Sequence, residues 1–146
     1  MDLNYKFIET MESFCINNLI KIVESISCDE YDDILDSRDD DEFSEKWMEI
    51  FNEVKAILKS NPIDALHTQR IENLRERTFK MIFQQSNSSD MAAYLSDDIA
   101  LLLEAVLCDY DSNWLNGMWI EYSVGRIPRG KVPLIHGKLK QLIETV

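Results

Sequence analysis

The sequence predicts an all-α fold, a single-domain bundle of about five to seven helices that spans residues 1–146. Apolar residues recur at spacings of three and four along most of the chain, which is the repeat of an amphipathic helix. The chain contains only four glycines and three prolines, too few for the frequent turns of a many-stranded sheet. Its hydrophobic fraction of 45% is typical of a globular protein with one continuous core.

The first part of the chain contains two strong helical patterns. An apolar stripe predicts one helix over residues 3–27, and a second stripe that begins with Phe43 and Trp47 predicts another over residues 43–58. Between them, the apolar residues of segment 31–35 indicate a short helix or a turn. Acidic residues in the first turn of the 43–58 helix complement its positive N-terminus.

Two further helices follow in the middle of the chain. Asn61 and Pro62 are typical of a helix N-cap and first helical residue, so we expect a third helix to begin there and to run through Ile82. A serine- and asparagine-rich loop separates it from a fourth helix over residues 91–110. The apolar stripe of this fourth helix is the broadest, which predicts the most central position in the bundle.

The last part of the chain is predicted to contain a shorter helix, a loop and a final helix. Trp114 to Tyr122 form the apolar part of the short helix. Segment 125–133 holds two of the four glycines and two of the three prolines, which predicts an ordered loop. We expect Pro133 to open a last helix.

The sequence also indicates in which cellular compartment to expect the protein. The N-terminal residues lack the basic and apolar regions of a signal peptide, and no apolar stretch approaches the length of a membrane span. We therefore expect a soluble, cytoplasmic protein that does not interact with membranes. Cys15, Cys28 and Cys108 are odd in number and lack CxxC spacing, which favours reduced, buried thiols over disulfides.

The net charge of −12 is the strongest compositional signal. Residues 1–60 carry 16 acids against 6 bases, and residues 61–110 carry 8 against 4. Residues 111–146 carry 3 acids against 5 bases, so the acidity is concentrated near the N-terminus. Binding to nucleic acid is not expected, because phosphate contacts need clustered lysine and arginine.

Recognisable catalytic or metal-binding patterns are absent from the sequence. His67 and His136 do not form a zinc-binding spacing, and none of the common phosphate-binding or nucleophile motifs occurs. Segment 29–40 fails as a calcium loop because its sixth position is isoleucine rather than glycine. Asp97-Asp98 is interpreted as a solvated pair on a polar helix face. We therefore expect no cofactor, no metal and no enzymatic activity.

Ten carboxylates crowd into segment 29–45, where Arg38 is the only opposing base. Such crowding costs stability unless water, salt or a cationic partner screens it. One interpretation is a solvated helix face or mobile loop. The other is a docking surface for a basic partner, with aromatic residues as apolar anchors. The candidate partner-binding residues are Tyr31, Asp32, Asp33, Asp36, Asp39, Asp40, Asp41, Glu42 and Trp47.

This profile of an acidic helical domain without catalytic residues, with aromatic residues among the acids of segment 29–45, resembles that of bacterial toxin-immunity proteins. The resemblance is greatest to those that protect against toxins of contact-dependent inhibition systems, and it extends over the whole chain by profile rather than by an aligned motif. It implies a tight complex with one cognate basic toxin, such as a nuclease, whose active site is covered or distorted.

Other function classes remain open. A helical small-molecule-binding module would place an apolar ligand in a cleft lined by Trp47, Trp114, Trp119 and Tyr122. These aromatic residues are also explained as core residues, although Trp114 and Trp119 lie on roughly opposed helix faces, which predicts that one of them is partly exposed. An enzyme with dispersed catalytic residues and an adaptor protein are further alternatives.

Overall fold

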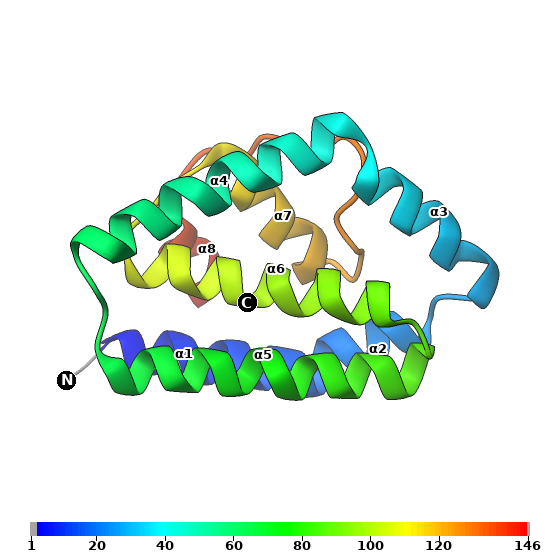
Figure 1. The fold of residues 1–146 in the computed structure, drawn as a ribbon, viewed down its shortest axis with the longest axis horizontal. Coiled ribbons are helices and arrows are strands. Elements are labelled where there is room, and N and C mark those ends of the chain that lie inside the picture. Colours follow the sequence, from blue (N-terminus) through cyan, green and yellow to red (C-terminus); the bar gives the residue numbers. More distant parts are fainter. Residues whose placement is uncertain (1–2, 146) are drawn as a thin grey trace.

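The computed structural model describes residues 3–145, and over this range the chain forms helices and no strand (Figure 1). Helix α1 (Leu3–Phe14) continues through a π-helical turn, η1 (Cys15–Leu19), into α2 (Ile20–Glu24). The remaining helices are α3 (Cys28–Asp39), α4 (Asp41–Ser60), α5 (Ala65–Ser86), α6 (Ser89–Leu107), α7 (Asn113–Ser123) and α8 (Leu139–Glu144). With α1, η1 and α2 counted as one helix, the described chain has seven, which confirms the predicted all-α bundle.

Helix α6 is the central element of the bundle. Thirteen of its 19 residues are buried, the largest number in any described helix. It packs along α5, and α1 lies beside both of these helices (Figure 1). Helix α4 crosses obliquely on the other side of α6, and the sequence-based expectation of a central fourth helix is confirmed.

Helix α7 has neighbours on two sides. Trp114 packs against Phe43 of α4 with ring centroids 5.0 Å apart, and Trp119 packs against Phe14 of α1 with centroids 4.9 Å apart. Both tryptophans are buried, so the expectation that one would be partly exposed is wrong. A helix that packs against other helices on opposite sides buries both faces, and sequence spacing within α7 does not reveal this.

The expected helix start at Asn61 and Pro62 is also wrong. Asn61 ends α4, and α5 begins only at Ala65. Asp64 is the N-cap, and its Oδ1 atom accepts a hydrogen bond from the Leu66 N–H at 2.7 Å. Asp64 is as good a capping residue as Asn61, and the three-residue shift leaves Pro62 in the connection between the two helices.

The last helix begins later than Pro133 predicts, because the preceding segment bonds to α7. The Asn116 side-chain amide donates hydrogen bonds to the carbonyl oxygens of Ile135 at 3.0 Å and Gly137 at 2.8 Å. Gly117 permits the close approach, since a Cβ atom there would lie 1.8 Å from the Pro133 oxygen. Helix α8 starts only at Leu139.

The three cysteines are free, but they are not all buried. Cys15 is buried in the core, Cys108 is half-buried and Cys28 is exposed at the start of α3. The expectation of buried thiols is therefore wrong for Cys28. Burial raises the pKa of Cys15 to about 12.

Candidate partner-binding surface

Helix α3, the start of α4 and Asp40 at the junction between them carry the ten carboxylates of segment 29–45. Ser27 precedes α3, and the Glu30 carboxylate accepts hydrogen bonds from the Ser27 N–H at 3.3 Å and from the Ser27 hydroxyl at 3.1 Å. This local bonding and the acidic first turns stabilise both helix N-termini. The chain therefore forms a 12-residue helix here, longer than the helix or turn that the sequence predicts for segment 31–35.

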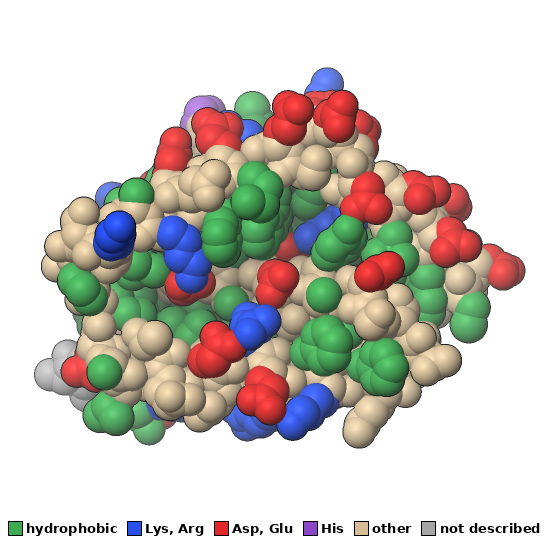
Figure 2. Space-filling model, in the orientation of Figure 1, with side chains coloured by type: hydrophobic (Ala, Val, Ile, Leu, Met, Phe, Trp, Pro, Cys, Tyr) green, Lys and Arg blue, Asp and Glu red, His purple; other side chains and the backbone are tan. Residues whose placement is uncertain are grey.

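All ten carboxylates are exposed, and we call this set the acidic surface. Figure 2 shows acidic side chains gathered over α3 and the adjoining part of α4. Among residues 3–145, none of the ten forms an ion pair with lysine or arginine. The members of the acidic surface are Asp29, Glu30, Asp32, Asp33, Asp36, Asp39, Asp40, Asp41, Glu42 and Glu45.

Within the described part of the chain, the basic and phenolic side chains next to the acidic surface do not form ion pairs with its carboxylates. Lys46 pairs with Glu49, outside the acidic surface, at 3.3 Å. The Tyr94 hydroxyl donates a hydrogen bond to Asp39, and this bond, with burial and the charge of Asp39, raises the pKa of Tyr94 to about 12. The hydrogen bond from Tyr94 thus holds the Asp39 side chain against α6.

Arg38, the only base inside the acidic segment, is buried and points away from the acidic surface. Its guanidinium forms a two-pronged ion pair with Asp98 of α6, with distances of 2.6 and 2.7 Å. It also donates to the Pro128 carbonyl oxygen at 3.1 Å and lies over the Phe43 ring. Burial lowers the pKa of Arg38, but the charge and hydrogen bonds of Asp98 raise it, and the net pKa lies above its ordinary value.

Asp98 is the centre of a buried polar network. Besides Arg38, it accepts hydrogen bonds from the Trp47 indole N–H at 2.9 Å and from the Tyr122 hydroxyl at 2.5 Å. Burial, followed by the negative charge of Asp98, raises the pKa of Tyr122 well above its ordinary value. The interpretation of Asp97-Asp98 as a solvated pair is wrong for Asp98, whose exposed fraction is 0%. The network fixes α3 and α4 on α6 and α7.

The structure divides the nine candidate partner-binding residues into two groups. The seven acids are exposed on α3, on α4 and at the junction between them. Tyr31 and Trp47 are half-buried and pack against the core. The Trp47 indole N–H donates a hydrogen bond to Asp98, and the Trp47 ring stacks on Phe51 with ring centroids 5.4 Å apart. Trp47 therefore offers only part of its ring to another molecule.

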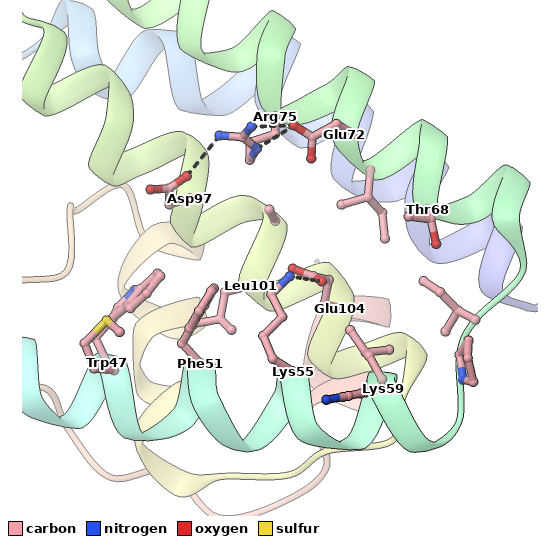
Figure 3. A pocket seen from close by; sticks show the side chains of 16 residues that line it. Trp47, Phe51, Lys55, Lys59, Thr68, Glu72, Arg75, Asp97, Leu101 and Glu104 are labelled. Carbon is pink, nitrogen blue, oxygen red and sulfur yellow. Dashed lines mark hydrogen bonds and ion pairs between the residues drawn. The ribbon is translucent and has the colours of Figure 1, made fainter.

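A groove that the sequence did not reveal lies between α4 and α5. The two helices diverge from their connection, and α6 forms the floor of a cleft of about 740 Å³ (Figures 2 and 3). We call this cleft the α4–α5 groove. Its lining residues are Trp47, Met48, Phe51, Lys55, Leu58, Lys59, Pro62, Ile63, Thr68, Ile71, Glu72, Arg75, Asp97, Ala100, Leu101 and Glu104.

All charged side chains that line the α4–α5 groove, except Lys59, form ion pairs with each other. Lys55 of α4 binds Glu104 of α6 at 2.7 Å. Arg75 of α5 lies between Glu72 and Asp97, and its distance to the Asp97 carboxylate is 3.3 Å (Figure 3). The interior between these pairs is apolar. No spacing in the sequence predicts the groove, because it depends on the angle between two helices.

Comparison with known protein families identifies the chain. Residues 10–129 match the family described as Immunity protein PIM1. The chain belongs to this immunity-protein family. The match covers α3 to α7 completely, and with them the acidic surface, the Asp98 network and the α4–α5 groove. No curated protein matches the chain.

Membership of an immunity-protein family implies binding to a cognate toxin and an inhibitory role. It confirms the resemblance that the acidic, helical profile indicated. Over residues 3–145, no helix has the length and apolar character needed to cross a membrane. The same residues contain no cluster of three or more side chains suited to hold a metal ion.

The aromatic cleft of the small-molecule alternative is not formed. Trp47 lines the α4–α5 groove, but Trp114, Trp119 and Tyr122 do not. Trp114 and Trp119 pack against separate phenylalanines, and Tyr122 bonds to Asp98. These three residues belong to the core and to the buried network, as the core interpretation of the aromatic residues predicted.

Proposed function

We propose that this PIM1-family immunity protein neutralises a cognate toxin whose binding face is positively charged, and that the acidic surface is the docking site. The toxin class that best fits this charge is a nuclease, because enzymes that cleave RNA or DNA are positive where they hold phosphate. An immunity protein bound over such a face would cover the substrate-binding site.

The observation that carries this proposal is the exposure of ten carboxylates without a lysine or arginine partner among the described residues. Exposed carboxylates at this density repel each other and cost folding stability. A positively charged partner would screen the repulsion among the carboxylates and would itself be attracted to them. The field of the acidic surface would accelerate the encounter with such a partner and orient it before contact.

The attachment of α3 to the interior supports the proposal, because Arg38 bonds it to Asp98 of α6 and to Pro128. Arg38 lies in the middle of the acidic segment in sequence, but its guanidinium forms an ion pair with Asp98 in the interior and does not neutralise the exposed acids. The segment therefore has its one internal cation on the buried face and its anions on the exposed face. Tyr31, half-buried on the same helix, supplies an apolar contact beside the charges.

The test is association kinetics with the purified cognate toxin, identified beforehand as the protein that co-purifies with the chain from its native host at low salt. The variant Asp32→Lys, Asp36→Lys, Asp40→Lys reverses three charges of the acidic surface. We expect its association rate at low salt to fall about tenfold, with a much smaller change in the dissociation rate. Protection of cells from the toxin should fall with it.

A matched control separates local from global charge. The variant Glu9→Lys, Glu76→Lys, Glu144→Lys changes the net charge equally, at exposed positions outside the acidic surface. We expect its association rate to stay within about twofold of the wild-type rate. Equal slowing in both variants would reject docking at the acidic surface in favour of a net-charge effect. An unchanged rate in the first variant would reject the electrostatic mechanism.

A further inference from the structure

The α4–α5 groove exposes apolar surface that the fold itself leaves uncovered. Met48 of α4 is 47% exposed and lies in the apolar lining of the groove. Beside it, Trp47 and Phe51 form a stacked pair that faces the groove (Figure 3). Ala100 and Leu101 of α6 form a floor without long side chains or free polar groups.

The internal ion pairs determine what the groove accepts. Glu104, Glu72 and Asp97 are each held by a lysine or arginine that also lines the groove. The middle of the groove therefore offers no unpaired charge to a guest. Apolar side chains fit this environment, because a charged guest would lose its hydration there without gaining a partner.

The groove is continuous with the acidic surface. Trp47 and Met48 also line a smaller hollow of about 260 Å³, together with Asp39 of the acidic surface and with Tyr94. A chain that leaves the groove past Met48 thus reaches Asp39 directly. At its opposite end, near the α4 C-terminus, the groove is lined by Lys59, which has no ion-pair partner among residues 3–145.

We propose that the α4–α5 groove binds an apolar segment of the toxin that is followed by lysine or arginine at the end nearest Asp39. The inference rests on the proposed function, and it adds the α4–α5 groove to the acidic surface as a second part of the toxin-binding interface. The acidic surface attracts the basic end of the segment, and the groove buries its apolar part. The two surfaces have separable roles: the charges govern association, and the groove governs dissociation.

The test uses Met48→Gln, which removes apolar character at the junction of groove and hollow without adding charge. Met48 takes part in no hydrogen bond of the Asp98 network, so the variant should fold normally, as circular dichroism will check. The control is Leu134→Gln, at an apolar residue that is 67% exposed outside the groove. Both variants are measured against the same purified cognate toxin as the charge-reversed variant.

We expect Met48→Gln to raise the dissociation rate about tenfold, the value for losing one well-buried apolar side chain, and to leave the association rate within about twofold. Leu134→Gln should match the wild type in both rates. A photo-reactive benzoylphenylalanine at position 48 should crosslink to a toxin peptide that contains apolar residues next to lysine or arginine.

Other outcomes overturn the inference in distinct ways. Unchanged rates for Met48→Gln, with slow association in the charge-reversed variant, would reject the groove and leave the proposed function standing. Absence of any complex with the wild-type protein would reject both. A dimer of the immunity protein alone that Met48→Gln disrupts would identify a second copy as the occupant. A crosslinked peptide without basic residues would reject the proposed segment chemistry.

Discussion

Arg38 and Asp98 form an ion pair in the interior of the protein, with side chains that are only 5% and 0% exposed. The pair joins α3 to α6 across 60 positions of the chain. Because Trp47 and Tyr122 donate to the same carboxylate, this one acid on α6 binds side chains from three other helices. The geometry of the acidic surface depends on this pair, since α3 carries Arg38 on one face and exposed acids on the other.

Asp98→Ala should lower the free energy of unfolding by about 3–5 kcal/mol, because it leaves the buried charge of Arg38 without a partner. The matched control is Asp97→Ala, one position earlier on α6. Asp97 is half-exposed and pairs with Arg75 at the surface, so this variant should cost less than about 1 kcal/mol. Urea unfolding of both proteins measures the difference. Equal losses would show that Asp98 does not organise the interior.

Gly117→Ala should destabilise the protein, although alanine is the better helix former. The added Cβ atom would lie 1.8 Å from the Pro133 carbonyl oxygen, so segment 133–138 would have to move away from α7. We expect a loss of about 1–3 kcal/mol by thermal or urea unfolding, as for other overpacked sites. A gain of up to about 1 kcal/mol, as alanine gives in an unobstructed helix, would contradict the close approach.

Asp36→Asn should stabilise the isolated protein. Asp36 is one turn of helix away from Asp32, Asp33 and Asp39, and like charges at these spacings cost about 0.2–0.5 kcal/mol each. We expect the unfolding free energy to rise by roughly 0.5–1 kcal/mol at low salt, and the gain to shrink as salt screens the charges. Glu144→Gln, at an exposed acid in α8, is the control and should have little effect. A loss of stability in Asp36→Asn would show that the carboxylates are neutralised internally.

The cysteines should react with thiol reagents in the order Cys28, Cys108 and Cys15. Cys28 is exposed, whereas burial raises the pKa of Cys108 and raises that of Cys15 to about 12. The reactive thiolate of Cys15 is therefore scarce in the folded protein below that pH, and its reaction should require unfolding. Mass spectrometry of the native protein labelled near neutral pH identifies the modified residues. Early labelling of Cys15 would contradict its burial.

The helical fold was predictable because it depends on local patterns. Apolar spacing located α4 and α6, and the acids of segment 29–45 lie on the surface as expected. The helix boundaries at Asp64 and Leu139 were not predictable in the same way. The first depends on which of two good capping residues is used, and the second on hydrogen bonds from Asn116 to a segment that is distant in sequence.

The Asp98 network and the α4–α5 groove required the three-dimensional structure. Asp98 lies beside Asp97 in sequence, and only the position of Arg38 on another helix explains why one is buried and the other half-exposed. The groove depends on the divergence of α4 and α5 over α6, which leaves no periodic signal. The sequence thus predicted where charge accumulates, but not the apolar surface beside it.

The most direct test of the central claim is the salt dependence of association between wild-type immunity protein and the purified toxin domain. Between about 20 and 300 mM NaCl, screening should lower the association rate by about tenfold or more, whereas the dissociation rate should change little. This result would mean that unneutralised carboxylates on α3 and α4 attract a positively charged toxin. An association rate that is independent of salt would contradict the account.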